Sequence, residues 1–163
     1  MDSLNWSAHE DRDLLNGASK SFVRQQLRDW SANCSTDEKS RPDAAPFIID
    51  QTPRTTYCVQ VDEAALKSVV EPDPKLSGPF DNLGFVNLVR ADWEVPDPAD
   101  HDPEETGFND PFDEGEDPVE GCRLWDVGWW KVSACGSMLG TYGRLLSKHW
   151  GISYVRPPGV AVH

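Results

Sequence analysis

Residues 92–120 read DWEVPDPADHDPEETGFNDPFDEGEDPVE, and this segment divides the chain into two halves of similar pattern. It holds 13 acidic residues, five prolines and no Lys or Arg. The whole chain of 163 residues has 28 acidic and 15 basic residues, so the remainder carries equal numbers of each. Such a segment repels itself and cannot bury enough apolar surface to offset its ordering entropy. We expect residues 92–120, called the acidic segment below, to form a long loop outside the core.

The half before the acidic segment predicts a strand, a helix and a second strand. Tyr57 and Val59 alternate with more polar residues, which is typical of a half-buried strand. Asp62 stands where a helix N-cap belongs, and apolar residues at helical spacing then predict a helix over 63–70. A second strand is expected over 84–93.

The half after the acidic segment repeats the order. Residues 124–133 are rich in aromatic and β-branched residues and predict a strand. An amphipathic helix follows to His149, with Ser137 or Ser133 as its N-cap. Gly151 is the expected stop signal, and a last strand is expected over 152–156.

Two strand-helix-strand units predict an α+β fold of the ferredoxin-like kind, a split β-α-β-β-α-β sandwich. The alternative is another α+β arrangement in which an N-terminal helix shares the sheet face. Ser7 and Glu10 form a capping-box pattern that predicts this helix over 8–32. We expect residues 1–50 to form the N-terminal helix and a linker, and residues 51–163 to form the domain. Whether the helix docks on the domain stays open.

The composition excludes several classes of partner. A net charge of −13 without clustered Lys or Arg disfavours nucleic acid and anionic membrane surfaces. No apolar run approaches the ~20 residues of a membrane span, and no signal peptide precedes the first predicted helix. The four cysteines have no C-x-x-C spacing, so free thiols in a reducing compartment are expected. We expect a cytoplasmic protein, with the nucleus as the alternative.

The acidic segment does not match a calcium loop. Counting from Asp110, position six is Gly115, but position twelve is Gly121 where a bidentate Glu is required. We expect no metal and no cofactor, although weaker Ca²⁺ binding stays open. Phe108 and Phe112 interleave with the carboxylates, and this pattern suits a segment that docks on a basic groove.

Catalytic patterns are weak. Cys135 lies at a strand-to-helix junction, but His149 at the far end of the same helix is roughly 20 Å away. The serine-hydrolase and phosphate-loop spacings are missing around Gly136. The remaining acid–base candidates are Asp126, Tyr142 and His149.

Tryptophans form the third candidate site. Trp125, Trp129 and Lys131 are expected on one face of the strand over 124–133, and Asp126 and Trp130 on the other. If one face is open, its Trp residues would mark an interface or pocket. The equally weighted alternative is that the N-terminal helix or the acidic segment covers it.

Four stretches carry a resemblance to a known group of proteins. EGCRLWDVGWWKV at 120–132, YVRPP at 154–158, CVQVDEAAL at 58–66 and GFVNLVRADW at 84–93 are similar to a module of filamentous-fungal proteins, some of which carry ankyrin repeats. The resemblance extends over about residues 57–158. It implies an intracellular protein and assigns no catalytic residue.

Two functions follow as expectations. The first is a non-catalytic interaction or regulatory module that binds a protein partner through the acidic segment or the Trp-bearing sheet face. Its binding candidates are Trp125, Trp129, Trp130, Phe108, Phe112 and Asp110. The second is a cofactor-free enzyme for an aromatic or polyketide-like molecule, built as a dimeric α+β barrel; a homodimer is therefore left open.

Overall fold

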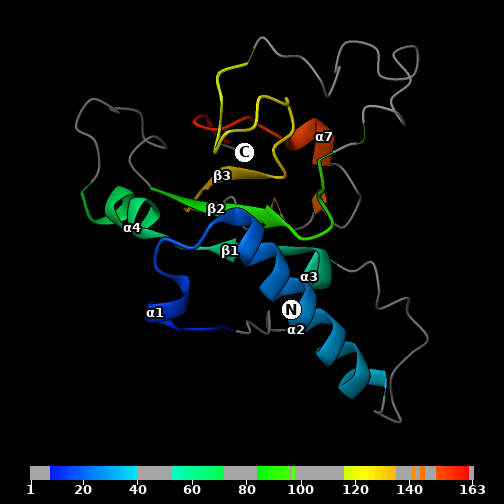
Figure 1. Ribbon diagram of the computed structural model, residues 1–163. Coiled ribbons are helices and arrows are strands. Elements are labelled where there is room, and N and C mark those ends of the chain that lie inside the picture. The colour runs from blue at the N-terminus through cyan, green and yellow to red at the C-terminus, as the bar shows by residue number, and fades with distance from the viewer. Residues whose placement is uncertain are drawn as a thin grey trace.

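The computed structural model has an α+β fold with one four-stranded sheet (Figure 1). It describes residues 8–39, 53–71, 84–95, 97, 116–134, 141, 144–145 and 150–161. In chain order its elements are α1 (Arg12–Leu15), α2 (Lys20–Lys39), α3 (Pro53–Thr56), β1 (Tyr57–Gln60), α4 (Glu63–Val70), β2 (Phe85–Arg90), β3 (Trp129–Ser133), α7 (Trp150–Ser153) and β4 (Val160–Ala161). Most of the acidic segment lies outside the described residues. The prediction that it forms a loop therefore stays a prediction.

The strands lie in the order β1-β2-β3-β4. β1 and β2 are antiparallel, with Tyr57 opposite Arg90. β2 and β3 are also antiparallel, with Leu88 opposite Trp130, whereas β3 and β4 are parallel. The sheet is therefore mixed, and its central strands are β2 and β3.

This order differs from a ferredoxin-like sheet. In that fold each strand-helix-strand unit contributes two parallel strands with a third strand between them. Here β1 and β2 are direct antiparallel neighbours although α4 connects them, and β3 and β4 are also direct neighbours. Hydrophobic periodicity indicates which elements form, but it does not say which strands pair. The α+β class is confirmed, and the described strands do not have the ferredoxin-like order.

α4 forms where the sequence predicts it. The Asp62 carboxylate accepts a hydrogen bond from the amide of Ala65 (2.8 Å), which is the N-cap interaction expected at this position. The hydroxyl of Ser68 accepts a hydrogen bond from the amide of Phe85 (2.9 Å). This hydrogen bond joins α4 to the start of β2.

The N-terminal helix expected over 8–32 is two helices instead. Gly17 has a φ of 72° and ends α1 in a turn, because a left-handed residue cannot continue an α-helix. The hydroxyl of Ser19 then accepts from the amide of Phe22 (3.2 Å) and caps the start of α2. The expected cap Ser7 lies outside the described residues.

The strand expected over 152–156 is wrong. Gly151 lies inside α7, the chain turns at Pro157-Pro158, and the last strand follows as β4. A strand would separate Trp150 and Tyr154 by about 13 Å. The helical turn of α7 brings their ring centroids to 5.7 Å, so aromatic packing outweighs the β-forming tendency of this stretch. Of the helix expected before it, only residues 141, 144 and 145 are described, and they are helical.

Both faces of the sheet bury side chains. The first face holds a cluster of buried residues: Leu88, Trp130, Val132, Leu145, Trp150, Tyr154 and Ala161. The opposite face holds Val89, Val127 and Trp129, and Val23 of α2 packs against them. Figure 1 shows α2 lying across β1 and β2. The N-terminal helix is therefore docked on the sheet. The domain boundary expected near residue 50 falls outside the described residues and stays a prediction.

Candidate functional site

The first candidate centre is Asp126, which precedes β3. Its Oδ2 accepts a hydrogen bond from the indole Nε1 of Trp150 (2.9 Å), and its Oδ1 accepts from the amide of Gly128 (2.7 Å). Arg90 Nη1 lies 3.4 Å from Oδ2 and pairs with the same carboxylate. Donors from β2, from α7 and from the segment before β3 thus use both oxygens of Asp126. A carboxylate held in this way positions its donors, and this arrangement disfavours a role as general base.

The other two acid–base candidates, Tyr142 and His149, lie outside the described residues. The described part of their helix includes Thr141 and Leu145, which are buried. The structure therefore does not test whether Tyr142 and His149 approach Asp126.

The aromatic residues form a continuous stack on the first face of the sheet. Trp130 is fully buried and stacks on Tyr154 with a centroid distance of 5.8 Å. Trp150 lies 5.4 Å from Trp130 and stacks on Tyr57 at 5.5 Å. Trp125 contacts Tyr154 edge-on at 6.3 Å and is 39% exposed. The centre of this stack lies in the core, and its two ends, Tyr57 and Trp125, reach solvent.

The hydroxyl of Tyr154 holds the chain before β3 in place. It donates to the carbonyl of Trp125 (3.0 Å) and accepts from the amide of Val127 (3.1 Å). Burial raises the pKa of this hydroxyl well above its ordinary value. Tyr154 therefore stays protonated and serves as a structural link between α7 and the segment before β3.

The sequence left open whether the Trp-bearing face is exposed or is covered by the N-terminal helix, and among the described residues α2 covers it. Trp129 is 8% exposed and packs beneath α2, and Trp130 lies within the core of the other face. Of the Trp residues named as binding candidates, Trp125 is the one that stays exposed. Phe108, Asp110 and Phe112 lie outside the described residues.

A second polar centre lies between α2 and the sheet. The ammonium of Lys20, the first residue of α2, donates to Gln60 Oε1 (2.5 Å) and pairs with Asp62 Oδ2 (3.4 Å). Asn87 Nδ2 donates to the same carboxylate oxygen (2.7 Å). Lys20 also lies 4.5 Å from the ring centroid of Trp129. We call these five residues the Lys20 cluster.

Sequence reasoning missed the Lys20 cluster. Its members lie between residues 20 and 129, up to 109 positions apart along the chain, so no local motif joins them. One signal was available: Gln60 and Asn87 are polar residues within the strands expected from the hydrophobic pattern. Both are buried and opposite each other on β1 and β2, where polar groups need hydrogen-bond partners.

The cluster makes stability depend on pH through Asp62. Partial burial alone would raise the pKa of this carboxyl, but the hydrogen bonds from Ala65 and Asn87 and the charge of Lys20 outweigh it. The pKa of Asp62 is therefore below its ordinary value of 3.8. A lowered carboxyl pKa contributes stability that is present above pH 3.8 and is lost as the pH falls through the folded-state pKa.

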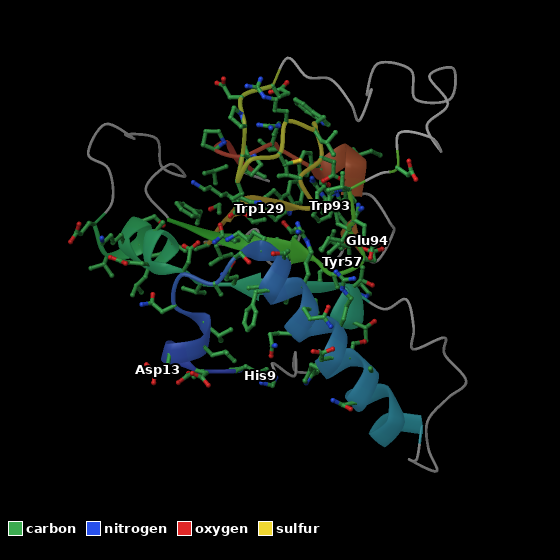
Figure 2. The ribbon with its side chains drawn as sticks, in the orientation of Figure 1. His9, Asp13, Tyr57, Trp93, Glu94 and Trp129 are labelled. Atoms are coloured by element: carbon green, nitrogen blue, oxygen red, sulfur yellow. The ribbon has the colours of Figure 1, made fainter. Side chains whose placement is uncertain are left out.

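We expect Asp62→Asn to flatten the acid limb of the stability profile. Asn is a good N-cap and keeps the shape of the side chain, so α4 should persist. Free energies of unfolding measured by urea titration between about pH 3 and pH 6 should fall less steeply for the variant than for the unsubstituted protein. Asp13→Asn on α1, which lies away from the cluster (Figure 2), is the control for removing one charge. Equal slopes in all three proteins would contradict the assigned role.

Arg24 joins α2 to the end of β2 and the segment before β3. Its Nη2 donates to the carbonyl of Val127 (2.7 Å), and its Nε donates to the carbonyl of Arg90 (3.2 Å). Its guanidinium lies 4.5 Å from the ring centroid of Trp93. Burial lowers the pKa of Arg24, but its ordinary value is so high that the group stays charged at neutral pH.

The described part of the chain gives little support to a reactive thiol or a metal site. Cys58 and Cys122 are free thiols, and burial raises the pKa of Cys58 to about 11, which disfavours a thiolate. The described ranges contain no group of three or more His, Cys, Asp or Glu side chains that could hold a metal ion. Cys135 lies outside these ranges.

The helices in the described ranges include none that is both long and apolar enough to cross a membrane. No protein-family model, curated protein or solved structure matches this chain.

Proposed function

We propose that this chain is a non-catalytic interaction module that binds a basic protein partner through the acidic segment. The observation that carries the proposal is the charge of residues 92–120, where 13 carboxylates occur without a single Lys or Arg. Such a segment attracts a positively charged surface over long range, and Phe108 and Phe112 supply apolar contacts once it docks.

The described ends of the acidic segment support this use. Glu94 pairs with Arg28 of α2 (3.1 Å), yet its side chain is 76% exposed. Glu116 lies 3.9 Å from Arg156 at the other end. Figure 2 shows Glu94 beside Trp93 at the margin of the molecule. Arginines of the folded body thus contact both ends of the segment, and acidic side chains there remain open to solvent.

The Trp-bearing faces of the sheet are covered in the described part of the chain. Trp129 and Trp130 are buried beneath α2 and in the aromatic core, respectively. Trp125 is exposed and lies five residues after Glu120, so it could extend a surface formed by the acidic segment. Trp125 can therefore serve as a contact residue, whereas Trp129 and Trp130 are too deeply buried to do so.

The enzyme alternative has less support. A dimeric α+β barrel encloses its cavity with an open sheet face, whereas Trp129 lies beneath α2 in a single chain. The strand order also differs from the ferredoxin-like units from which such barrels are built. Asp126, the described acid–base candidate, has both oxygens engaged by structural donors.

We expect neutralisation of the acidic segment to weaken binding of a Lys/Arg-rich peptide, the probe for a basic partner. In the test variant Asp110, Asp113 and Glu114 become Asn, Asn and Gln. In the control variant the exposed residues Asp13, Asp29 and Glu71 are neutralised in the same way. Both variants lose three negative charges, so they have equal net charge.

Fluorescence anisotropy at about 50 and 200 mM salt should show that the test variant binds at least about fivefold more weakly than the control. The difference should shrink at the higher salt concentration, because surface charges are then screened. Equal weakening in both variants would mean nonspecific attraction to an acidic protein. That result, or no binding by the unsubstituted protein, would overturn the proposal.

A further inference from the structure

Contacts between a basic side chain and an aromatic ring recur among the described residues. In four pairs the charged group lies 4.2–5.0 Å from the ring centroid: Lys20 over Trp129, Arg24 over Trp93, Arg90 over Trp150 and Lys131 over Phe85. A cation in this position is attracted by the negative face of the ring. The fold therefore uses the same contact on aromatic residues of β2, β3, α7 and the segment after β2.

Trp125 has an exposed ring without such a cation. It is 39% exposed, and no basic side chain lies over its ring in the described part of the chain. Its ring contact is with Tyr154, edge-on at 6.3 Å with 72° between the two planes. An edge-on neighbour covers at most one of the two faces of an indole. At least one face of Trp125 is therefore left for a cation from another molecule.

Hydrogen bonds fix the backbone of Trp125. Its carbonyl accepts a hydrogen bond from the hydroxyl of Tyr154 (3.0 Å), and the carbonyl of Leu124 accepts one from Nε of Arg156 (3.1 Å). A ligand that binds to a residue already held in position loses less conformational entropy than one that must order a mobile segment. The exposed ring is therefore preorganised for binding.

The surroundings of Trp125 favour a positively charged ligand. Glu116 of the acidic segment lies 3.9 Å from Nε of Arg156, the same atom that donates to the Leu124 carbonyl. The last part of the acidic segment therefore lies beside the residue that precedes Trp125. Residues 116–126 contain four carboxylates and one Arg, so this part of the chain has a net negative charge.

We propose that Trp125 is a cation–π contact site for a Lys or Arg side chain of the basic protein partner, an inference that rests on the proposed function. The carboxylates of the acidic segment attract the partner over long range, and the indole of Trp125 then binds one of its cationic side chains at short range. Tryptophan is the aromatic residue that binds cations best. The ring thus supplies a part of the affinity that does not depend on long-range charge.

Replacing the ring tests the site. Trp125→Leu removes the aromatic face but keeps an apolar side chain, whereas Trp125→Phe keeps a weaker aromatic face. Leu66→Ala on α4 is the control for losing exposed apolar surface, since Leu66 is 57% exposed. The Lys/Arg-rich peptide is titrated into each full-length protein and followed by fluorescence anisotropy. Trp125→Leu should bind about threefold more weakly than the unsubstituted protein, Trp125→Phe by a smaller factor, and Leu66→Ala without a change.

The salt dependence separates the ring contact from long-range attraction. The loss of affinity in Trp125→Leu should be similar at about 50 and 200 mM salt, because salt screens groups in direct contact much less than charges separated by solvent. The loss caused by neutralising the acidic segment should shrink over the same range.

Far-ultraviolet circular dichroism checks that each variant is folded. If Trp125→Leu is unfolded, Trp125→Phe alone keeps the test, and its affinity should still fall measurably below that of the unsubstituted protein. Unchanged binding by the Trp125 variants, equal weakening by Leu and Phe at this position, or equal weakening in Leu66→Ala would overturn the cation–π site and leave the proposed function standing. No binding of the peptide by the unsubstituted protein would overturn both.

Discussion

Trp130→Ala is expected to lower the free energy of unfolding by about 3–5 kcal/mol, the range for removing a buried tryptophan. The Trp130 side chain is completely buried. It contacts the rings of Trp150 and Tyr154 at centroid distances of 5.4 and 5.8 Å, so its loss removes two aromatic contacts together with the buried area. The neighbouring residues are parts of β2, β3 and α7 and can collapse only partly into the space.

Trp125→Ala is the matched control for this experiment. Trp125 belongs to the same aromatic stack but is 39% exposed, so its removal should cost less than about 2 kcal/mol. Urea denaturation followed by far-ultraviolet circular dichroism gives both values without depending on tryptophan fluorescence. Because single domains of this size often unfold in one step, the two midpoints can be compared directly. Equal losses in the two variants would show that Trp130 is not at the centre of the core.

Local signals explain which parts of the fold the sequence predicts. α4 is predicted with its observed bounds, because Asp62 is a strong N-cap and the apolar residues that follow have helical spacing. β1, β2 and β3 occur inside the stretches expected for them, although each is shorter. These elements depend on neighbours within a few residues, so their patterns are visible in the chain itself.

Tertiary contacts decide what the sequence does not reveal. The stretch over 152–156 has strand-forming residues, yet α7 forms because Trp150 and Tyr154 both reach the core around Trp130. The strand order depends on pairings between distant segments, which periodicity does not specify. In the same way, the sequence left open whether the face around Trp129 is covered, and the residue of α2 that covers it, Val23, lies 106 positions earlier in the chain.

The candidate sites also depend on contacts between distant segments, which the sequence does not reveal. Asp126 was singled out as an acid–base candidate, whereas the structure shows its carboxylate engaged by Trp150 and Arg90, which lie 24 and 36 residues away. The Lys20 cluster has no spacing pattern, because α2, β1 and β2 each contribute to it separately. A polar residue at an inward strand position, such as Asn87, is the one signal that could have indicated it.

Gly128→Ala is expected to destabilise the protein by about 2–5 kcal/mol, through two costs that add. Gly128 has a φ of 71°, where any residue with a Cβ is strained. A methyl group there would also overlap the side chain of Trp93 and lie 2.6 Å from Nη2 of Arg24. The backbone has little freedom to move away, since its amide donates to Asp126 and its carbonyl accepts from the amide of Arg90.

Gly121→Ala separates the two costs. Gly121 has a φ of 82°, but nothing lies within 4 Å of a methyl group placed on it, so only the backbone strain of about 1–2 kcal/mol should appear. In a chain that also carries Trp93→Ala, the overlap at Gly128 is partly relieved, and the cost of Gly128→Ala should approach that of Gly121→Ala. Urea denaturation of the four variants gives the coupling between the two positions. Additive losses at Trp93 and Gly128 would contradict the close packing of β2, α2 and the segment before β3 around Arg24.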